Sequence, residues 1–298
     1  MQKTLVSICG PTAVGKTALS IYLAKEFNTE IISCDSRQFF KELQIGVAPP
    51  DKKELKEVPH HFIQHLSIFE PYSVGDYERD ALKKLTALFQ KYNTVMMVGG
   101  SGLYEKAVTE GLDDFPEVDS AIRDRLNLQF KEEGIEPLQQ LLKEKDPVFF
   151  NKMDLQNHQR LIRALEICIE TGKPYSSFRK NHLKNRPFNT IKIGLDLNRA
   201  VLYENIHLRV DKMMEKGLLN EAERLYPHKE LNALQTVGYR EFFRFFNHEI
   251  DLDFAIEEVK KNTRRFAKRQ LTWFRRDSKI KWFEPDKVNE ISTYIKSL

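Results

Sequence analysis

A phosphate-binding motif lies near the start of the sequence, at residues 10–17. The run Gly-Pro-Thr-Ala-Val-Gly-Lys-Thr matches the pattern G-x-x-x-x-G-K-[ST] at every fixed position. Its glycines let the backbone fold around an anion, so that N–H groups and the start of the following helix point at phosphate oxygens. Lys16 adds a positive charge, and the Thr17 hydroxyl is a ligand for Mg²⁺. We therefore predict a phosphate cradle with Mg²⁺, although the motif does not identify the phosphate compound.

A carboxylate, Asp35, follows the second predicted strand at residues 30–33. In an open α/β sheet, ligands bind at the carboxyl ends of the strands, so we expect Asp35 near the cradle. Asp is also common as a helix N-cap or turn residue. The sequence alone does not decide between these two roles.

The third predicted strand, residues 94–98, ends in Gly-Gly-Ser-Gly at positions 99–102. A P-loop hydrolase places an acid after such a strand to hold Mg²⁺ and to position the attacking water. Glycines and Ser101 stand there instead. This weakens the interpretation as an ATPase and leaves Asp35 as the strand-end carboxylate near the phosphates.

The elements that must position these residues are those of an α/β protein. An apolar run at 5–9 predicts a buried strand before the cradle, and helical apolar spacing follows it from Ala18 to Ala24. We predict a P-loop parallel sheet core with flanking helices, formed by residues 1–112 plus 189–298, and an inserted all-helical domain at 113–188 without strand signals. The remaining expected elements are a strand at 191–197 and helices at 77–92, 121–130, 137–144, 159–171, 200–216, 218–226, 240–246 and 256–275.

Composition limits the class of protein. The 298 residues are 41% hydrophobic and 30% charged, as in soluble globular proteins. Three scattered cysteines do not predict a disulfide framework or a zinc site. The sequence has no apolar run of membrane-spanning length and no signal peptide, so we expect a cytoplasmic protein without membrane contact.

Positive charge is concentrated near the C-terminus. The whole chain carries +4, yet residues 256–281 hold ten Lys and Arg against three acids, a local +7, which leaves −3 for the rest. Within the last long helix, rows at i, i+4 spacing form a predicted cationic strip beside an apolar stripe. A solvated face is the alternative, but a strip without interleaved acids predicts contact with RNA. The strip consists of Lys260, Arg264, Lys268, Lys261, Arg265 and Arg269, and the stripe of Ile256, Val259, Phe266, Gln270 and Trp273.

Seven motifs in order give a resemblance to a known family. They are GPTAVGKT, ISCDSRQ, VPHHF, VGGSGLY, QRLIRALEI with TGKP, VGYRE and AKRQLTWFR. Together they extend from Gly10 to Arg275, and the chain resembles the bacterial tRNA dimethylallyltransferases, also called tRNA isopentenyltransferases. Each motif alone is modest, but their order is highly specific.

The resemblance implies transfer of a dimethylallyl group from dimethylallyl diphosphate to the exocyclic amine of the adenosine 3′ to the anticodon, with release of diphosphate. Asp35 matches the general base of the family, and Ser101 matches a hydroxyl near the reacting groups. Arg209 matches an arginine that meets the diphosphate, together with Lys16 and with Mg²⁺ on Thr17. The diphosphate would be held by Gly10, Pro11, Thr12, Ala13, Val14, Gly15, Lys16 and Thr17.

The resemblance also implies contacts with the anticodon stem-loop of tRNA, and we expect a monomeric enzyme. Two runs depart from the family pattern. Gly46-Val47-Ala48-Pro49-Pro50 replaces GTAKP and lacks its lysine and hydroxyl, and Gln156-Asn157 replaces an Asn-Asp pair. The positions that match RNA contacts are Asp35, Ser36, Arg37, Gln38, Ser101, Arg123, Gln159, Arg160, Leu161, Ile162, Arg163, Gln235, Gly238, Tyr239 and Arg240, to which the cationic strip adds Arg264 and Lys268.

Three alternatives stay open on the sequence. An adenylate isopentenyltransferase that acts on a free nucleotide shares the cradle and the acid, but it has no use for a basic helical insert. A nucleoside or nucleotide kinase shares the same arrangement and would bind ATP in the cradle. A non-catalytic RNA-binding protein would leave the cradle without a purpose.

Overall fold

The computed structural model describes residues 2–180 and 183–298. The chain divides into two compact units, Met1–Glu110 with Asn185–Leu298, and Gly111–Lys184. Residue 1 of the predicted core and residues 181–182 of the predicted insert lie outside the described residues. In the part of the chain that is described, no helix is both long and apolar enough to cross a membrane.

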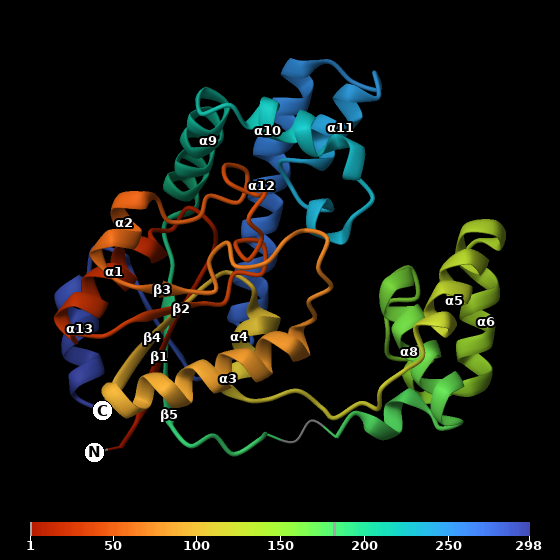
Figure 1. Ribbon diagram of the computed structural model, residues 1–298, viewed down its shortest axis with the longest axis horizontal. Helices are drawn as coiled ribbons and strands as arrows, with labels where there is room; N and C mark the ends of the chain where they lie inside the picture. The colour runs from red at the N-terminus through yellow and green to blue at the C-terminus, as the bar shows by residue number, and fades with distance from the viewer. Residues whose placement is uncertain (1, 181–182) are drawn as a thin grey trace. The chain divides into compact units, whose positions relative to one another are not determined.

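The first unit is built on a parallel six-stranded sheet in the order β3-β2-β4-β1-β5-β6 (Figure 1). The predicted α/β fold with a parallel P-loop core is therefore confirmed. Neither edge strand was predicted from the sequence: β3 has two residues, and β6 lies near the C-terminus. The strands are β1 (Thr4–Cys9), β2 (Ile31–Ser33), β3 (His60–His61), β4 (Thr94–Val98), β5 (Asn189–Leu195) and β6 (Ile280–Phe283).

Helices cover both faces of this sheet, as Figure 1 shows. Alternation along β1 explains the two layers, because successive side chains of a strand point to opposite faces. Val6 and Ile8 join the core under α1 (Lys16–Glu26) and α13 (Val288–Lys296). Leu5 joins the core under α3 (Val74–Lys91) and α4 (Gly102–Thr109).

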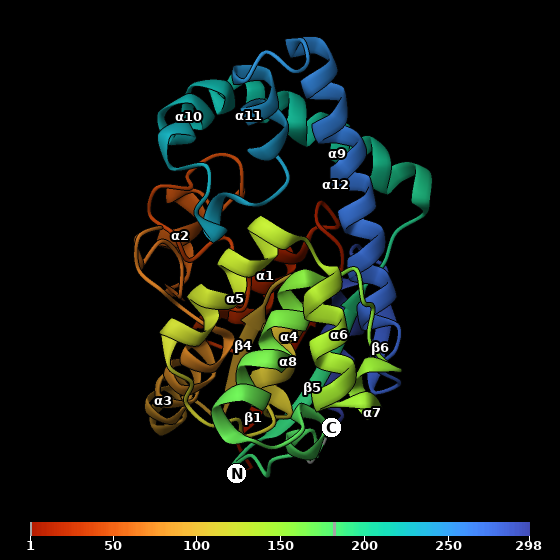
Figure 2. The same cartoon turned by 90° about the vertical axis from the view of Figure 1, so that its right-hand side faces the viewer.

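A third core lies beyond the carboxyl edge of the sheet and is formed by helices of the C-terminal half. Its longest helix, α12, begins at Leu252 because the Asp251 carboxylate accepts a hydrogen bond from the Phe254 N–H at 2.7 Å. It therefore starts one turn before the predicted residue 256. Figure 2 shows α12 running from this core down to the β6 edge of the sheet. The other helices here are α9 (Arg199–Glu215), α10 (Leu218–Leu225) and α11 (Arg240–Phe246). The short helix α2 (Lys52–Glu57) buries no residue and is not part of this core.

All the regular secondary structure in the described residues of the second unit is helical. It is shorter than the predicted insert because residues 185–188 already pack on the sheet unit, where Arg186 pairs with Glu78 at 2.6 Å. Leu126, Leu138 and Leu161 lie in its buried core. Its helices are α5 (Ser120–Glu133), α6 (Glu136–Lys145), α7 (Pro147–Phe150) and α8 (His158–Thr171), followed by a 3₁₀ turn at Tyr175–Phe178.

A buried ionic cluster joins the middle of the sheet to α4 and to the end of α12. The Lys192 ammonium, on β5, lies 2.7 Å from Asp277, 2.9 Å from Glu110 and 3.4 Å from Glu105. Burial alone would lower the pKa of Lys192, but the three carboxylates raise it well above its ordinary value. Burial raises the pKa of Glu105. Burial acts in the same direction at Asp277, but the hydrogen bonds from Lys192 and Lys279 and the charges of both lysines together outweigh it and lower the pKa of that carboxyl.

Lys192→Met should therefore destabilise the protein by about 3–5 kcal/mol, since it leaves buried carboxylates without their counter-charge. The sign of the pH dependence should also change. In the wild-type protein the depressed pKa of Asp277 makes the free energy of unfolding fall as pH drops towards 4, because the unfolded state binds more protons. In the variant the unpaired carboxylates have raised pKa values, so its stability should rise over the same pH range.

Urea unfolding of both proteins between pH 7 and pH 4 measures this difference. Lys25→Met removes a single exposed ion pair with Glu57 and is the matched control, for which only a small change is expected. A Lys192→Met variant that loses stability on acidification as the wild type does would contradict the assignment.

Candidate active site

The phosphate cradle connects β1 to α1, and its backbone adopts the conformation that the motif requires. Gly10 and Gly15 have φ values of 141° and 100°. A Cβ atom on Gly10 would lie 2.6 Å from the carbonyl oxygen of Leu195, so no side chain fits there. Helix α1 starts without a side-chain cap and without an acid in its first turn. Its first N–H groups and the positive end of its dipole are therefore available to an anion.

Lys16 folds back over this cradle. Its Nζ donates to the carbonyl oxygens of Gly10 at 3.0 Å and Pro11 at 2.7 Å. Burial lowers the pKa of Lys16 to about 8; Asp35 opposes this shift and Arg209 adds to it. The head group is thus a poorly solvated cation, for which an added anion would be a favourable partner.

Asp35 lies in a turn after β2, and its role as a turn residue is visible in its contacts. The Asp35 carboxylate accepts from the Arg37 N–H at 3.3 Å, and the Asp35 carbonyl from the Gln38 N–H at 3.0 Å. The second carboxylate oxygen is 3.6 Å from the place of a Cβ atom on Gly100. The same carboxylate acts electrostatically on Lys16. The turn therefore directs Asp35 into the space between the cradle and the glycine turn after β4, as its position at a strand end predicts.

The glycine turn after β4 contacts the Asp35 turn directly. The Ser101 Oγ accepts from the Ser36 N–H at 3.0 Å and lies 3.0 Å from the Ser36 hydroxyl. Ser101 also stands at the N-cap position of α4, but its side chain makes no capping hydrogen bond. Its hydroxyl is thus oriented by the neighbouring turn instead of by its own helix.

Arg209 reaches the cradle from α9. Its guanidinium donates to the Thr12 hydroxyl at 3.3 Å and to the Ala48 carbonyl at 3.4 Å. Burial lowers the pKa of Arg209, while the charge of Asp35 favours the protonated form. The structure thus brings Lys16, Thr17, Asp35, Ser101 and Arg209 to one edge of the sheet.

A buried glutamine that sequence reasoning did not assign to the site holds this edge together. Gln270, on α12, accepts from the Thr12 N–H of the cradle at 2.9 Å and donates to the Gly100 carbonyl at 2.9 Å. A Cβ atom on Gly100 would lie 2.2 Å from the Gln270 amide nitrogen, so that position requires glycine. A polar residue within an apolar helical stripe was the signal that could have identified Gln270.

A second unpredicted residue, Glu221 on α10, fixes residues 44–46. Its carboxylate accepts from the N–H groups of Gln44, Ile45 and Gly46 at 2.9–3.0 Å, and from the Tyr239 hydroxyl at 2.7 Å. Tyr239 is fully buried, and its neighbour Gly238 is also buried. These two residues pack within the fold here, and their contact with RNA stays a prediction.

Other predicted RNA contacts fall into two groups. Arg37 donates to the carbonyls of Asn232 and Ala233, and Gln38 donates to Ala48 at 3.0 Å, so both brace loops around the site. Gln235 and Arg240, in contrast, are exposed.

In the second unit, Leu161 and Ile162 are core residues and cannot contact RNA in this conformation. Arg123 and Arg163 both pair with the buried Glu166, which fixes their direction. Gln159 and Arg160 remain exposed on α8.

The predicted cationic strip of α12 is only partly unpaired. Lys260 pairs with Asp211 at 2.9 Å and Lys261 with Glu258 at 2.7 Å, so acids do interleave at its start. Arg264 turns towards α9, where it contacts His207 and the Tyr203 ring. Lys268 is exposed and has no ionic partner among the described residues.

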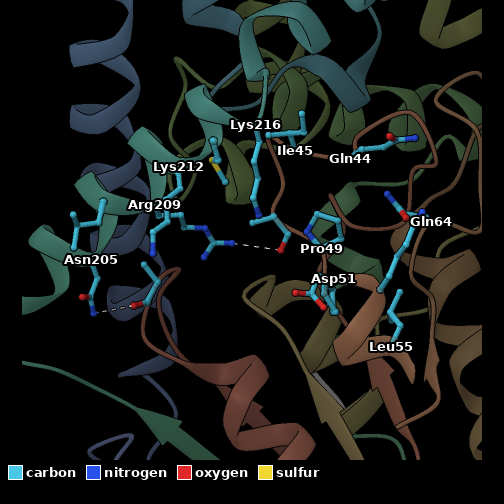
Figure 3. Close-up of a pocket in the computed structure, with 16 residues that line it drawn as sticks. Gln44, Ile45, Pro49, Asp51, Leu55, Gln64, Asn205, Arg209, Lys212 and Lys216 are labelled. Carbon is cyan, nitrogen blue, oxygen red and sulfur yellow. Dashed lines mark hydrogen bonds between the residues drawn. The ribbon is translucent and has the colours of Figure 1, made fainter. Parts of the chain in front are cut away.

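A cavity of about 740 Å³ adjoins the cradle at Ala13 (Figure 3). One wall is the segment that departs from the family pattern, including Pro49, and the opposite wall is α9 with Lys212 and Lys216. Figure 3 shows the Lys216 side chain extending towards that segment. Residues 46–50 have no cationic side chain, and Lys212 and Lys216 place positive charge in the same cavity.

The residues that could hold Mg²⁺ are few. The Thr17 hydroxyl stands at the start of α1, and the described residues contain no group of three His, Cys, Asp or Glu side chains suited to a metal. This suits an ion that keeps several waters and binds mostly to phosphate oxygens, as Mg²⁺ does.

Comparison with known proteins gives consistent matches. Residues 38–277 match a family model described as IPP transferase. A tRNA dimethylallyltransferase of Christiangramia forsetii is 59% identical over 298 residues, which is 100% of this chain and 99% of the relative. The corresponding protein of Flavobacterium johnsoniae is 55% identical, over 98% of this chain and 97% of its own.

Solved structures give the same result. The full-length tRNA isopentenylpyrophosphate transferase of Bacillus halodurans matches with a TM-score of 0.74 and 36% identity, over 100% of this chain and 96% of the other. A eukaryotic dimethylallyltransferase described as acting on tRNA matches with a TM-score of 0.75 and 29% identity, over 91% of this chain and 69% of that chain.

Gln270→Leu should disconnect the cradle from the β4 turn, because a leucine of similar size leaves the Thr12 N–H and the Gly100 carbonyl unpaired. Each buried unpaired group costs about 1–3 kcal/mol. We expect weaker binding of inorganic diphosphate by isothermal titration calorimetry, together with a lower melting temperature. Gln129→Leu, at a partly exposed glutamine of α5, is the control. Equal diphosphate affinity in Gln270→Leu and wild type would refute the role of Gln270 in holding the cradle to the β4 turn.

The lowered pKa of Lys16 predicts that diphosphate affinity falls as pH rises through about 8. Lys16 is charged below this pKa and neutral above it, and the bound anion favours the charged form, so binding takes up a proton at high pH. The dissociation constant should increase by up to about tenfold per pH unit above 8. Lys16→Met should bind weakly and show only the pH dependence of diphosphate itself. Parallel profiles for the two proteins would contradict the prediction.

Proposed function

This chain belongs to the IPP transferase family, and we propose that it prenylates the adenosine 3′ to the anticodon of tRNA, with dimethylallyl diphosphate as donor. It is an enzyme that transfers a dimethylallyl group to tRNA, as its 59% identical relative is named. The observation that carries the finer proposal is the arrangement at one sheet edge: the cradle, Asp35 and Ser101 converge there.

The difficult part of this reaction is departure of diphosphate. The bond between C1 of the allylic chain and its oxygen breaks with positive charge on the carbon and negative charge on the leaving group. Cradle N–H groups, Lys16 and Arg209 are placed to stabilise that negative charge. Preorganised donors of this kind contribute about 3–4 kcal/mol each. Mg²⁺ bound at Thr17 would neutralise further charge on the diphosphate.

The second requirement is activation of the nucleophile, because the exocyclic amine of adenine is weakly basic. We assign Asp35 as the group that orients the amine and accepts its proton while the nitrogen–carbon bond forms. Ser101, oriented by the Ser36 turn, would hydrogen-bond the reacting groups. The charge of Asp35 interacts with the charge of Lys16, which lies at the proposed diphosphate site.

The adenine must leave the stacked anticodon loop to reach Asp35, and base flipping is the general solution. Exposed Gln235 and Arg240 in the first unit, and Arg123, Arg160 and Arg163 in the second, are proposed to hold the loop by its phosphates and shape. Since tRNA is the substrate, we place the reaction in the cytoplasm, and we propose a monomer as the working unit.

A single incubation tests this proposal. The protein, unmodified tRNA, Mg²⁺ and dimethylallyl diphosphate should yield tRNA heavier by one five-carbon group, which nuclease digestion and mass spectrometry would locate beside the anticodon. Prenylation of free adenylate but not tRNA would favour the nucleotide-specific alternative. Transfer of labelled phosphate from ATP would favour a kinase.

Asp35→Asn keeps the size of the side chain and removes the base. The turnover number should fall by about 10²–10⁴, the usual contribution of a general base. The dissociation constant for tRNA, measured by filter binding, should change little. Turnover close to that of the wild type would exclude Asp35 as the base.

A further inference from the structure

Trp273 is an exposed aromatic residue beside the active-site turn. It follows Gln270 by three residues on α12, and 41% of its surface is exposed, although the helical pattern predicted it on the packed stripe. Its indole lies against Gly102, where a Cβ atom would be 2.1 Å from the ring. Gly102 is adjacent to Ser101, so the ring is held rigidly next to a residue of the proposed reaction site.

Charged residues of both signs lie near this indole. Trp273 lines a cavity of about 300 Å³ together with Lys106 and Arg276 and with the ionic cluster of Lys192, Glu105, Glu110 and Asp277. Two turns earlier on the same helix, Phe266 is 37% exposed and the Arg269 guanidinium lies 5.8 Å from the centre of its ring.

The spacing of these side chains suits a single strand of nucleic acid. Positions 266, 269 and 273 recur at i, i+3 and i+7, so they share one face and extend over roughly 10 Å at 1.5 Å per residue. That is about the length of three nucleotides at 3.4 Å each. Aromatic rings interleaved with cations are the usual surface for unpaired bases, because every base has a flat face that stacks and every nucleotide has a phosphate that attracts a cation.

A scattered exposed aromatic residue is by itself ordinary. Here the positive charge argues for a polyanion as the occupant: Lys268 and Arg269 have no ionic partner among residues 2–180 and 183–298. If the occupant were a second copy of this chain, that copy would have to place its own surface against Lys268 and Arg269.

We propose that Trp273, extended by Phe266, is a stacking platform for unpaired bases of the anticodon loop that flank the target adenosine. This proposal rests on the proposed function, since it deepens how the same site holds its RNA. Stacking on Trp273 would keep a neighbouring base next to Ser101 while the adenine is flipped towards Asp35.

Fluorescence tests the platform directly, because the chain has two tryptophans. In Trp282→Phe, Trp273 is the sole tryptophan. Titration with a 17-nucleotide anticodon stem-loop should quench its emission, whereas inorganic polyphosphate, which has charge but no bases, should not. Emission that is unchanged by a saturating stem-loop would overturn the proposal.

Affinity separates stacking from charge. Trp273→Ala should weaken stem-loop binding by about tenfold without changing its salt dependence, whereas Trp273→Phe should retain most of the affinity. Lys268→Ala, the control for a phosphate contact, should weaken binding and lower the salt slope by about one. Unchanged affinity in both Trp273→Ala and Phe266→Ala would overturn the platform, as would concentration-dependent dimerisation that these variants abolish without an effect on RNA.

The prenyl-transfer assay on wild-type protein distinguishes the two proposals. If the wild type prenylates tRNA and Trp273 is not quenched, only the platform fails. If the wild type does not prenylate tRNA, the proposed function fails independently of the fluorescence result.

Discussion

The active-site edge depends on one buried amide. The two turns that carry the chemistry, the cradle after β1 and the glycine turn after β4, follow neighbouring strands, and among the described residues no backbone hydrogen bond joins one turn to the other. Gln270 satisfies a donor in one and an acceptor in the other. The amide can do both because its oxygen accepts while its NH₂ group donates. Helix α12 thereby sets the distance between diphosphate site and base, although Gln270 is 258 residues later in the chain than Thr12.

Buried cations serve two different purposes here, and their partners distinguish them. Lys192 is surrounded by three carboxylates, and its pKa is raised, so its charge is fully compensated within the fold. Lys16 and Arg209 are also buried, but they share the carboxylate Asp35, to which only Glu54 is added at Arg209, and burial lowers the pKa values of both cations. Their desolvation is incompletely offset, which is the expected condition of cations that await an anionic ligand.

The sequence predicted those parts that short-range chemistry determines. The cradle, the four central strands and the helical character of the insert follow from local pattern, because each is set by residues close together in the chain. The two edge strands could not be predicted in this way. Strand β3 has only two residues, and β6 is defined by its pairing with Lys192 to Leu195 of β5, far away in the chain.

The site residues divide along the same line. Asp35, Lys16 and Thr17 belong to local motifs, whereas Gln270 and Glu221 act on partners far away in the chain, which helical periodicity does not reveal. Helical periodicity also placed Phe266 and Trp273 on the packed face, although both are exposed. Periodicity identifies a face of the helix but not how far along that face the neighbouring elements extend.

The segment at residues 46–50 shows how a lost side chain can be compensated across a cavity. Pro49 and Pro50 cannot provide charge, yet their fixed φ angles limit the conformations of the loop. Glu221 holds the start of this loop through three N–H groups, and Arg209 and Gln38 hold the Ala48 carbonyl. The loop is therefore held at both points, and Lys212 and Lys216, from the C-terminal end of α9, line the same cavity. Charge placed on the helix instead of the loop still lies beside the cradle, because the two walls enclose one cavity.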